Sequence, residues 1–301
     1  EEAIGSKIAD YLIKPVNPNQ ILLSLKKNLD HSRLISEKTT LDYQKEFRKI
    51  AMEMAMVNSF DEWAEFYRKL VYWEIELETI EDQNLIQILE SQKAEANLQF
   101  GKFIERNYED WFDEKADKPI LSHKLFGELV APEIRKKDKP ILFVVIDNLR
   151  LDQWKIFENI VFNHYKPEKE VNYYSILPTA TQYARNAIFA GLLPLEMEKK
   201  YPQYWKNDTD EGGKNMHEAD FLEANLKRLG KQVKWSYNKI TNYDAGKKLL
   251  DQFSQLKNNE LNVIVYNFVD MLSHARTDME VIRELADDEA AYRSLTISWF
   301  E

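Results

Sequence analysis

The stretch Ile141-Leu142-Phe143-Val144-Val145-Ile146-Asp147 indicates the fold class of this chain most clearly. Its apolar residues run without interruption over a length typical of a strand that is buried on both faces of a parallel sheet. The run ends at a carboxylate, and open α/β sheets bind their ligands at the carboxyl ends of their strands. The stretch therefore predicts a buried strand of an α/β sheet, with Asp147 at the ligand-binding edge.

Strand-like and helix-like segments continue to alternate after this stretch. Further strands are expected at 171–177, 232–237 and 262–268. Helices are expected at about 149–161, 183–190, 216–229 and 244–256. Such alternation is typical of an α/β domain with a parallel sheet.

The preceding hundred or so residues have helical periodicity and almost no glycine. Helices are expected at about 31–57, 59–79, 82–111 and 122–134. Ser59 and Glu62 have the spacing of a capping box, which satisfies free amides in the first turn of a helix. The spacing of the bulky residues after this cap favours the core of a helical bundle over a base-stacking surface; these residues are Trp63, Phe66, Leu70 and Trp73. This region is expected to be a spacer or a signal-transmitting bundle.

The first thirty residues predict a strand at 8–13 and an amphipathic helix at 19–29. The segment Ala9-Asp10-Tyr11-Leu12-Ile13-Lys14-Pro15 resembles the end of a response-regulator receiver domain. That resemblance implies that Lys14 senses a phosphorylated aspartate and that Tyr11 reorients on activation. A plain strand end is the alternative. The phospho-accepting aspartate of the family has no counterpart here, so phosphorylation is assigned to no residue of this chain.

Composition limits the possible partners. The chain has 301 residues, no cysteine and a formal net charge of -10. The negative charge disfavours binding to duplex DNA, and the lack of thiolates leaves His, Asp, Glu and hydroxyl groups as metal ligands. No apolar run approaches the roughly 20 residues that cross a bilayer, and no signal peptide is recognisable. We expect a cytoplasmic protein.

Side chains able to bind metal follow three of the expected strands. Asp147 follows the first, Thr181 follows the strand expected at 171–177, and Asp270 and His274 follow the last. A spacing of four lets the last two converge on one ion. Each residue alone has a simpler explanation, since Asp147 or Thr181 could cap a helix and the Asp/His pair could be a surface pair. Their joint position at strand ends favours a metal site.

The same motifs resemble the PglZ domain of the alkaline phosphatase superfamily. They are Val144-Val145-Ile146-Asp147-Asn148-Leu149-Arg150, Pro178-Thr179-Ala180-Thr181 with Gly191-Leu192-Leu193-Pro194, and Asp270-Met271-Leu272-Ser273-His274. The resemblance implies a nucleophile at Thr181 rather than Thr179, because the distance from Thr181 to Gly191 matches the family. It implies two zinc ions, one on Asp147 and Thr181 and the other on Asp270 and His274.

Further zinc ligands are expected beyond residue 301. We therefore expect the sequence as given to bind zinc poorly and to be inactive, and the complete protein to be active. Arg150 and Arg185 lie near the motifs, and a structural ion pair is favoured for each over contact with phosphate.

The expected fold class is α/β plus all-α, with a receiver remnant at 1–30, a helical bundle at 31–135 and the alkaline-phosphatase-like domain at 136–301. This order resembles the PorX-like family of response regulators, which is linked to type IX secretion.

The resemblance implies that the protein is a zinc-dependent phosphodiesterase acting on oligonucleotides or cyclic nucleotides. It also implies a histidine kinase, a secretion-system component and a sigma factor as partners, and a phosphorylation-dependent homodimer. A signalling adaptor without turnover and a phosphomonoesterase or phosphoglycerate-mutase-like enzyme are the alternatives.

Overall fold

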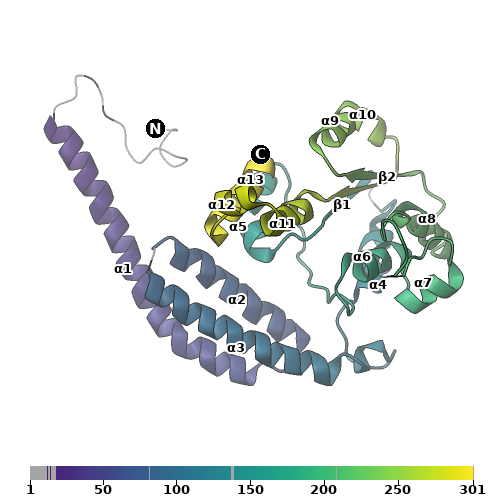
Figure 1. Cartoon of the computed structure of the whole chain (residues 1–301), viewed down its shortest axis with the longest axis horizontal. Helices are drawn as coiled ribbons and strands as arrows, with labels where there is room; N and C mark the ends of the chain where they lie inside the picture. The colour runs from purple at the N-terminus through teal and green to yellow at the C-terminus, as the bar shows by residue number, and fades with distance from the viewer. Residues whose placement is uncertain are drawn as a thin grey trace. The chain divides into compact units, whose positions relative to one another are not determined.

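The chain forms two compact units, Glu1–Phe112 and Asp113–Glu301 (Figure 1). The computed structural model describes residues 12, 14, 18–80, 82–136, 139–207 and 209–300. The first unit is helical, and the second contains a parallel sheet with helices around it. A helical region followed by an α/β domain confirms the expected fold class in this general form.

Three long helices form the first unit: α1 (Pro18–Met56), α2 (Phe60–Glu78) and α3 (Gln83–Asn107). A short 3₁₀ helix, η1 (Asp110–Phe112), follows. The predicted capping box is present, because the Glu62 amide donates to Ser59 Oγ (3.2 Å) and the Ser59 amide donates to Glu62 Oε2 (3.1 Å). It satisfies amides at the start of α2 that the helix itself leaves without acceptors.

The core of this unit contains the aromatic stripe of α2. Trp63, Phe66, Leu70 and Trp73 are all buried, which confirms the bundle-core interpretation. A polar link joins α1 to α3, since Tyr43 Oη donates to Gln92 Oε1 (3.0 Å). Burial raises the pKa of Tyr43 to about 12, so the hydroxyl keeps its proton and remains a donor.

The N-terminal region differs from expectation in one respect. Helices predicted separately at 19–29 and 31–57 are one continuous helix, α1, of 39 residues. No glycine or proline lies between the two segments, so nothing in the sequence ends the first helix. Lys14 lies at an exposed bend, whereas Tyr11 and most of the strand expected at 8–13 lie outside the described residues.

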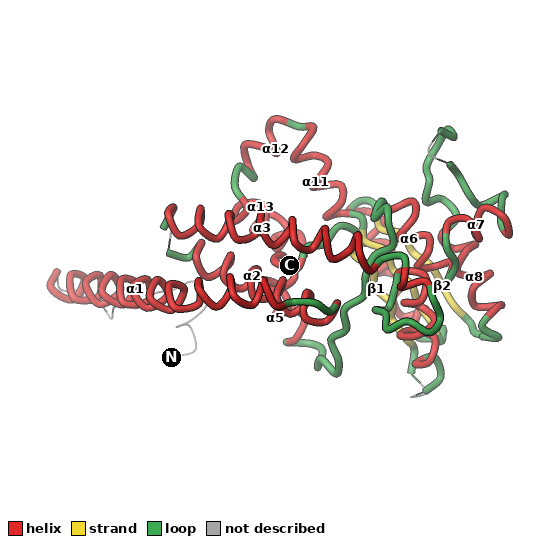
Figure 2. The backbone as a smooth tube through the Cα atoms, turned by 90° about the horizontal axis from the view of Figure 1, so that it is seen from below, coloured by secondary structure: helices red, strands yellow, loops and turns green. Residues whose placement is uncertain are grey.

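The second unit is built on a parallel sheet of three strands in the order β1-β3-β2. The strands are β1 (Ile141–Ile146), β2 (Trp235–Ile240) and β3 (Leu261–Tyr266), which lie side by side (yellow in Figure 2). Ile146 and Ile240 are both in register with Tyr266. All three strands therefore end at the same edge of the sheet.

The prediction of a strand at 171–177 is wrong. This segment is a loop with one isolated parallel bridge, between Leu121 and Tyr174, and no place in the sheet. Val171, Tyr173 and Leu177 remain exposed. β-branched and aromatic residues form a strand only where a neighbouring strand pairs with them, and here the pairing is limited to the single bridge between Tyr174 and Leu121.

Helices cover both faces of the sheet. Phe189 on α6 (Thr181–Ala190) packs against Phe143 and Tyr237 on one face. On the other face α9 (Tyr243–Asp251) and α10 (Phe253–Leu256) pack against Ile264.

The strands differ in how far they are buried. β3 is buried along most of its length, whereas β1 exposes Leu142 and Val144. The expectation that 141–146 is buried on both faces is therefore wrong. β1 is a terminal strand of this sheet, and a terminal strand is covered less than a central one.

The remaining helices of this unit are shorter. They are α4 (Ser122–Leu125), a π turn at Phe126–Val130, a 3₁₀ turn at Ala131–Glu133, α5 (Leu151–Phe162), α7 (Pro194–Lys200), α8 (Glu218–Arg228), α11 (Phe268–Asp278), α12 (Glu280–Leu285) and α13 (Glu289–Phe300). The helix predicted at 122–134 is thus divided into three short turns. Among the described helices, none is long and apolar enough to cross a membrane.

Gly191 ends α6 at a position that other residues fit poorly. It has φ +60, and a Cβ there would lie 2.6 Å from Asn225 Oδ1. Asn225 cannot easily move away, because its Nδ2 donates to the Phe189 carbonyl oxygen (3.0 Å). We expect Gly191→Ala to lower the free energy of unfolding by about 2–4 kcal/mol, measured by urea denaturation.

Gly230→Ala is the matched control. Gly230 has φ +66, but no atom lies within 4 Å of the position that a Cβ would take there, so this variant carries the backbone cost alone. Its expected cost is about 1 kcal/mol. Equal losses in the two variants would show that the contact with Asn225 does not matter.

Candidate functional site

Asp147 lies at the carboxyl end of β1, still within the register of the sheet. Its amide donates to the Tyr266 carbonyl oxygen (2.9 Å), and the Asn267 amide donates to the Ile240 carbonyl oxygen (3.1 Å). These bonds extend the strand pairing by one residue. Asp147 and Asn267 therefore leave the sheet at its carboxyl edge, where such sheets bind ligands.

Arg185 joins this edge to α6. Its guanidinium forms short ion pairs with Asp147 and Glu218, and Nη1 lies 3.4 Å from Asn267 Oδ1. The side chains of Arg185 and Glu218 are 5% and 1% exposed. Buried charges of this kind are tolerated because each has a partner of opposite charge. The structural ion pair predicted for Arg185 is confirmed.

Glu218 connects the same network to β2. Its Oε2 accepts a hydrogen bond from Tyr237 Oη (2.6 Å) and lies 3.1 Å from Lys239 Nζ. Burial raises the pKa of Tyr237, and the charge of Glu218 raises it further, so the phenol remains a donor. The first residue of α8 is thereby fixed against the outer strand of the sheet.

Asp270 lies in the first turn of α11, the helix that follows β3, and its charge acts on Asp147. Burial raises the pKa of Asp147, and the negative charges of Asp270 and Glu218 add to this shift, against the opposing charge of Arg185. For Arg185, burial alone would lower the pKa, but Glu218 and Asp147 reverse this and raise it. Asp147 and Asp270 are thus electrostatic neighbours although they are far apart in sequence.

Thr181 is the first residue of α6 and is partly buried. Its carbonyl oxygen accepts a hydrogen bond from Asn215 Nδ2 (3.0 Å), and the Asn215 carbonyl oxygen accepts one from Lys239 Nζ (3.1 Å). Thr181 and Arg185 are four residues apart and lie on the same side of the helix. Because Arg185 reaches Asp147, the start of α6 faces the carboxyl edge of the sheet.

The loop before Thr181 carries a tyrosine on which the charge of Asp147 acts. Tyr173 is 42% exposed. Protein atoms around its hydroxyl nevertheless raise its pKa, and the charge of Asp147 raises it further. The segment predicted as a strand is a loop, and it leads to Thr181 at the start of α6.

Asp270 and His274 lie on α11, directly beyond β3. Asp270 Oδ1 is 3.7 Å from His274 Nε2, and their side chains are 26% and 74% exposed. The spacing of four places both on one face of the helix, as the sequence predicts. The pair is accessible from solvent and close enough for the two side chains to contact one ion.

These donors fit part of a divalent-metal site. Carboxylate, hydroxyl and imidazole groups suit zinc. The site also has more negative than positive charges, because it contains three carboxylates and two cations. The carboxylates are Asp147, Glu218 and Asp270, and the cations are Arg185 and Lys239. However, no group of three or more His, Asp or Glu side chains suited to one ion occurs in the described part of the chain. The roles of Asp147, Thr181, Asp270 and His274 as ligands remain predictions.

The simpler explanations for Asp147 and Thr181 can be compared with the helix ends. The N-cap of α5 is Arg150, not Asp147, and the N-cap of α6 is Ala180, not Thr181. Neither residue is therefore an N-cap. Arg150 pairs with Asp152 (2.6 Å), which confirms the structural ion pair predicted for it.

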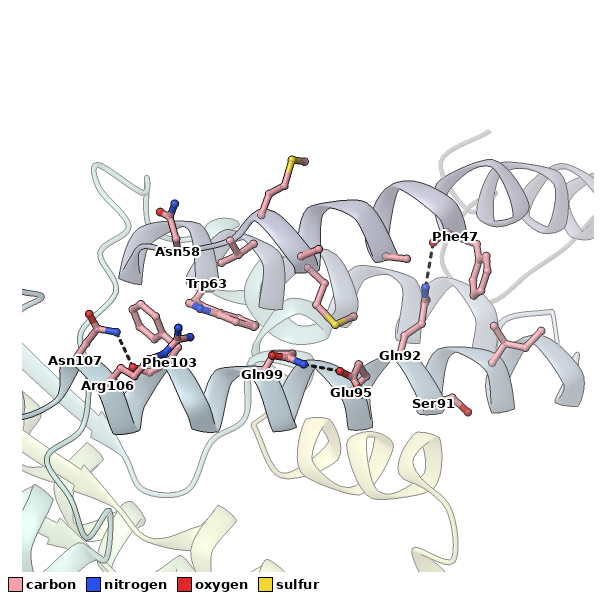
Figure 3. A pocket seen from close by; sticks show the side chains of 16 residues that line it. Phe47, Asn58, Trp63, Ser91, Gln92, Glu95, Gln99, Phe103, Arg106 and Asn107 are labelled. Atoms are coloured by element: carbon pink, nitrogen blue, oxygen red, sulfur yellow. Dashed lines mark hydrogen bonds between the residues drawn. The ribbon is translucent and has the colours of Figure 1, made fainter.

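A groove of about 1030 Å³ lies in the helical unit, between α1 and α3 (Figure 3). Gln92 lies across it and donates to the Phe47 carbonyl oxygen (3.1 Å). Its charged lining residues are Glu95 and Arg106, and the rest of the lining is apolar or uncharged. The groove has no set of acids and bases for hydrolysis, so the candidate site is the carboxyl edge of the sheet.

Several members of the network at this edge were missed by sequence reasoning. Nothing in the sequence distinguishes Glu218 or Lys239 from ordinary surface residues, because an acid in the first turn of a helix is common and Lys239 belongs to no motif. Asn215 lies in a loop without a motif. Asn267 had a usable signal, because it directly follows a strand at the ligand-binding edge.

Comparison with protein families defines the class of the second unit. Residues 125–297, more than half of the chain, match the BREX system PglZ alkaline phosphatase-like domain. The chain therefore belongs to the PglZ family, within a superfamily of phosphoesterases. Residues 33–112 match the PorX response regulator linker domain. Together the two matches are those of a PorX-like protein with a PglZ domain, which confirms the family predicted from the motifs. No curated protein matches the chain.

Proposed function

We propose that the protein is a response regulator whose PglZ domain hydrolyses phosphodiesters in oligonucleotides or cyclic nucleotides, with Thr181 as the nucleophile. The observation that supports this most directly is the ion pair between Arg185 and Asp147. It brings α6, which begins at Thr181, to the edge that also carries Asp270. A helix start there favours a phosphate, because its free amides and dipole attract negative charge.

The proposed reaction has two steps on Thr181. Its Oγ1 loses a proton and bonds to phosphorus, while one ester oxygen leaves with the bonding electrons and takes up a proton. Water then displaces Thr181 from phosphorus and restores the hydroxyl. Asp147 is held by Arg185 and the sheet, so it offers a fixed carboxylate beside the reacting group.

Two zinc ions are the proposed cofactors, one held by Asp147 and Thr181 and the other by Asp270 and His274. Bound zinc lowers the pKa of a coordinated hydroxyl or water and neutralises charge on phosphate oxygens. The exposed Asp270–His274 pair supports this proposal through its donor chemistry.

Removal of metal should therefore abolish hydrolysis of a nitrophenyl phosphodiester by the complete protein, and zinc should restore it. Asp270→Asn should weaken zinc binding at least about tenfold in calorimetry. Asp244→Asn is the matched control, because Asp244 is also an acid in the first turn of a helix but is exposed and distant in sequence from the motifs. Equal zinc affinity in both variants would exclude Asp270 as a ligand.

A signalling adaptor without turnover is the second candidate. It is supported by the close pairing of Asp147 with Arg185, which occupies a proposed metal ligand. An adaptor would bind its partners but would not hydrolyse the diester, with or without zinc. A preference for a nitrophenyl monoester over the diester would instead favour the phosphomonoesterase alternative.

The regulatory part of the proposal concerns residues 1–135. We propose that residues 1–30 end a receiver domain in which Lys14 and Tyr11 respond to phosphorylation by a histidine kinase, and that 31–135 transmit this state to the domain at 136–301. The proposed result is a cytoplasmic homodimer that contacts a secretion-system component and a sigma factor of type IX secretion. The match of 33–112 to a response-regulator linker supports the signalling role.

A further inference from the structure

A smaller pocket, of about 380 Å³, lies beside the candidate site in the second unit. Its wall includes the loop after β1, helix α11 and the segment joining α12 to α13. The lining residues that could contact a ligand by charge or hydrogen bonds include Asn148, Arg150, Ser273, Arg276, Thr277 and Arg283. Three of these six are arginines, in a chain whose net charge is -10.

The pocket shares two structural elements with the candidate site. Asn148 directly follows Asp147, and Ser273 directly precedes His274. On α11 the row formed by Ser273 and Thr277 lies about 60° around the helix from the row formed by Asp270 and His274. A ligand that extends from the proposed metal ligands along α11 therefore enters this pocket.

Two of the arginines are held in place by the protein. Arg150 lies 5.2 Å and Arg276 lies 4.8 Å from the centre of the Tyr292 ring, which is buried. Both also pair with Glu289, at 2.5 Å and 2.8 Å. Their guanidinium groups are thus fixed before any ligand binds, which lowers the entropic cost of binding.

The third arginine has free binding capacity. Arg283 is exposed and forms no ion pair within the part of the chain that the structure describes. Its guanidinium group is therefore available to a ligand.

The charges in and around the pocket leave a positive excess. There are four positive charges, on the three pocket arginines and on Arg293, which pairs with Asp152. Three negative charges oppose them, on Asp287 in the pocket and on the ion-pair partners Asp152 and Glu289. The net charge of this group is therefore +1, and the unpaired positive charge is that of the exposed Arg283.

We propose that this pocket binds a second phosphate group of the substrate, next to the phosphate attacked by Thr181. Guanidinium groups bind phosphate oxygens through paired, charge-assisted hydrogen bonds, and arginine is the side chain best suited to this geometry. The proposal rests on the proposed function and narrows it. A cyclic mononucleotide has one phosphate, whereas an oligonucleotide or cyclic dinucleotide has at least two and can occupy both positions.

The test compares two dinucleotides that differ by one phosphate: thymidylyl-thymidine with and without a 5′-phosphate. Affinities are measured by calorimetry at low salt with the complete protein carrying Thr181→Ala, so that no probe is hydrolysed. We expect the 5′-phosphorylated probe to bind about 5- to 10-fold more tightly, as one charge-assisted hydrogen-bonded contact allows. Adding Arg283→Gln should remove this preference and leave the affinity for the unphosphorylated probe unchanged.

Arg33→Gln is the control for loss of one positive charge, since Arg33 is 70% exposed and belongs to the other unit. It should retain the full preference. Equal affinity for the two probes, or a preference that survives Arg283→Gln, would overturn the proposal. If the preference depends on Arg283 but the wild-type protein hydrolyses neither probe, the phosphate pocket is supported and the proposed function fails instead.

Discussion

Replacing Thr181 by alanine should reduce hydrolysis of a nitrophenyl phosphodiester by the complete protein by at least about 1000-fold. The change removes the atom that we propose bonds to phosphorus. The fold should be preserved, because Ala180 and not Thr181 is the N-cap of α6, and the Thr181 hydroxyl forms no hydrogen bond within the described residues. The measurement is the initial rate with saturating zinc, together with a thermal unfolding curve.

Thr179→Ala is the matched control. Thr179 has the same side chain, lies two residues earlier and is in an exposed loop outside the helix. We expect it to retain most of the activity. Loss of activity in Thr179→Ala with retention in Thr181→Ala would move the nucleophile, and equal activity in all three proteins would support the adaptor.

Replacing Arg185 by methionine should lower the free energy of unfolding of the second unit by about 3–5 kcal/mol. Methionine keeps much of the volume of the side chain but leaves Asp147 and Glu218 without their shared cation, and both are largely buried. Uncompensated charges in such a site are costly because protein atoms replace water around them. Chemical denaturation followed by tryptophan fluorescence measures this loss, and Trp205, which packs against α6 through Tyr183, is one of the tryptophans of this unit that contribute to the signal.

Arg283→Met is the control for this stability measurement. It removes the same charge from an exposed position in the same unit that has no ion pair among the described residues, so a change within about 0.5 kcal/mol is expected. Arg185→Lys should be intermediate, because an ammonium group supplies charge without the planar fork that spans two carboxylates. A loss of stability in Arg185→Met no greater than in Arg283→Met would show that the network does not stabilise the domain.

The strands could be predicted where they are continuous apolar runs. Ile141–Ile146 was predicted at its observed bounds, and Leu261–Tyr266 within two residues. β2 was predicted three residues too early, because its sequence, Trp235–Ile240, mixes polar and apolar residues and gives no clear period. Strand boundaries of this kind depend on the partner strand, which a local pattern does not contain.

The candidate site could be predicted only in part. Its residues follow strands or begin a helix, so their positions are visible in the sequence, as for Asp147 and Asp270. The ion pair of Asp147 with Arg185 and the buried position of Glu218 arise from the packing of α6 and α8 against the sheet. Such contacts join segments far apart in the chain, and no local spacing encodes them.

Trapping of the covalent intermediate shows whether Thr181 bonds to phosphorus at the carboxyl edge of this sheet. The complete protein is mixed with a phosphodiester and zinc, quenched in acid within one turnover, digested and analysed by mass spectrometry. We expect the phosphoryl group, with its remaining ester substituent, to be attached to Thr181. Turnover without any adduct on Thr181, or an adduct on another residue, would contradict it.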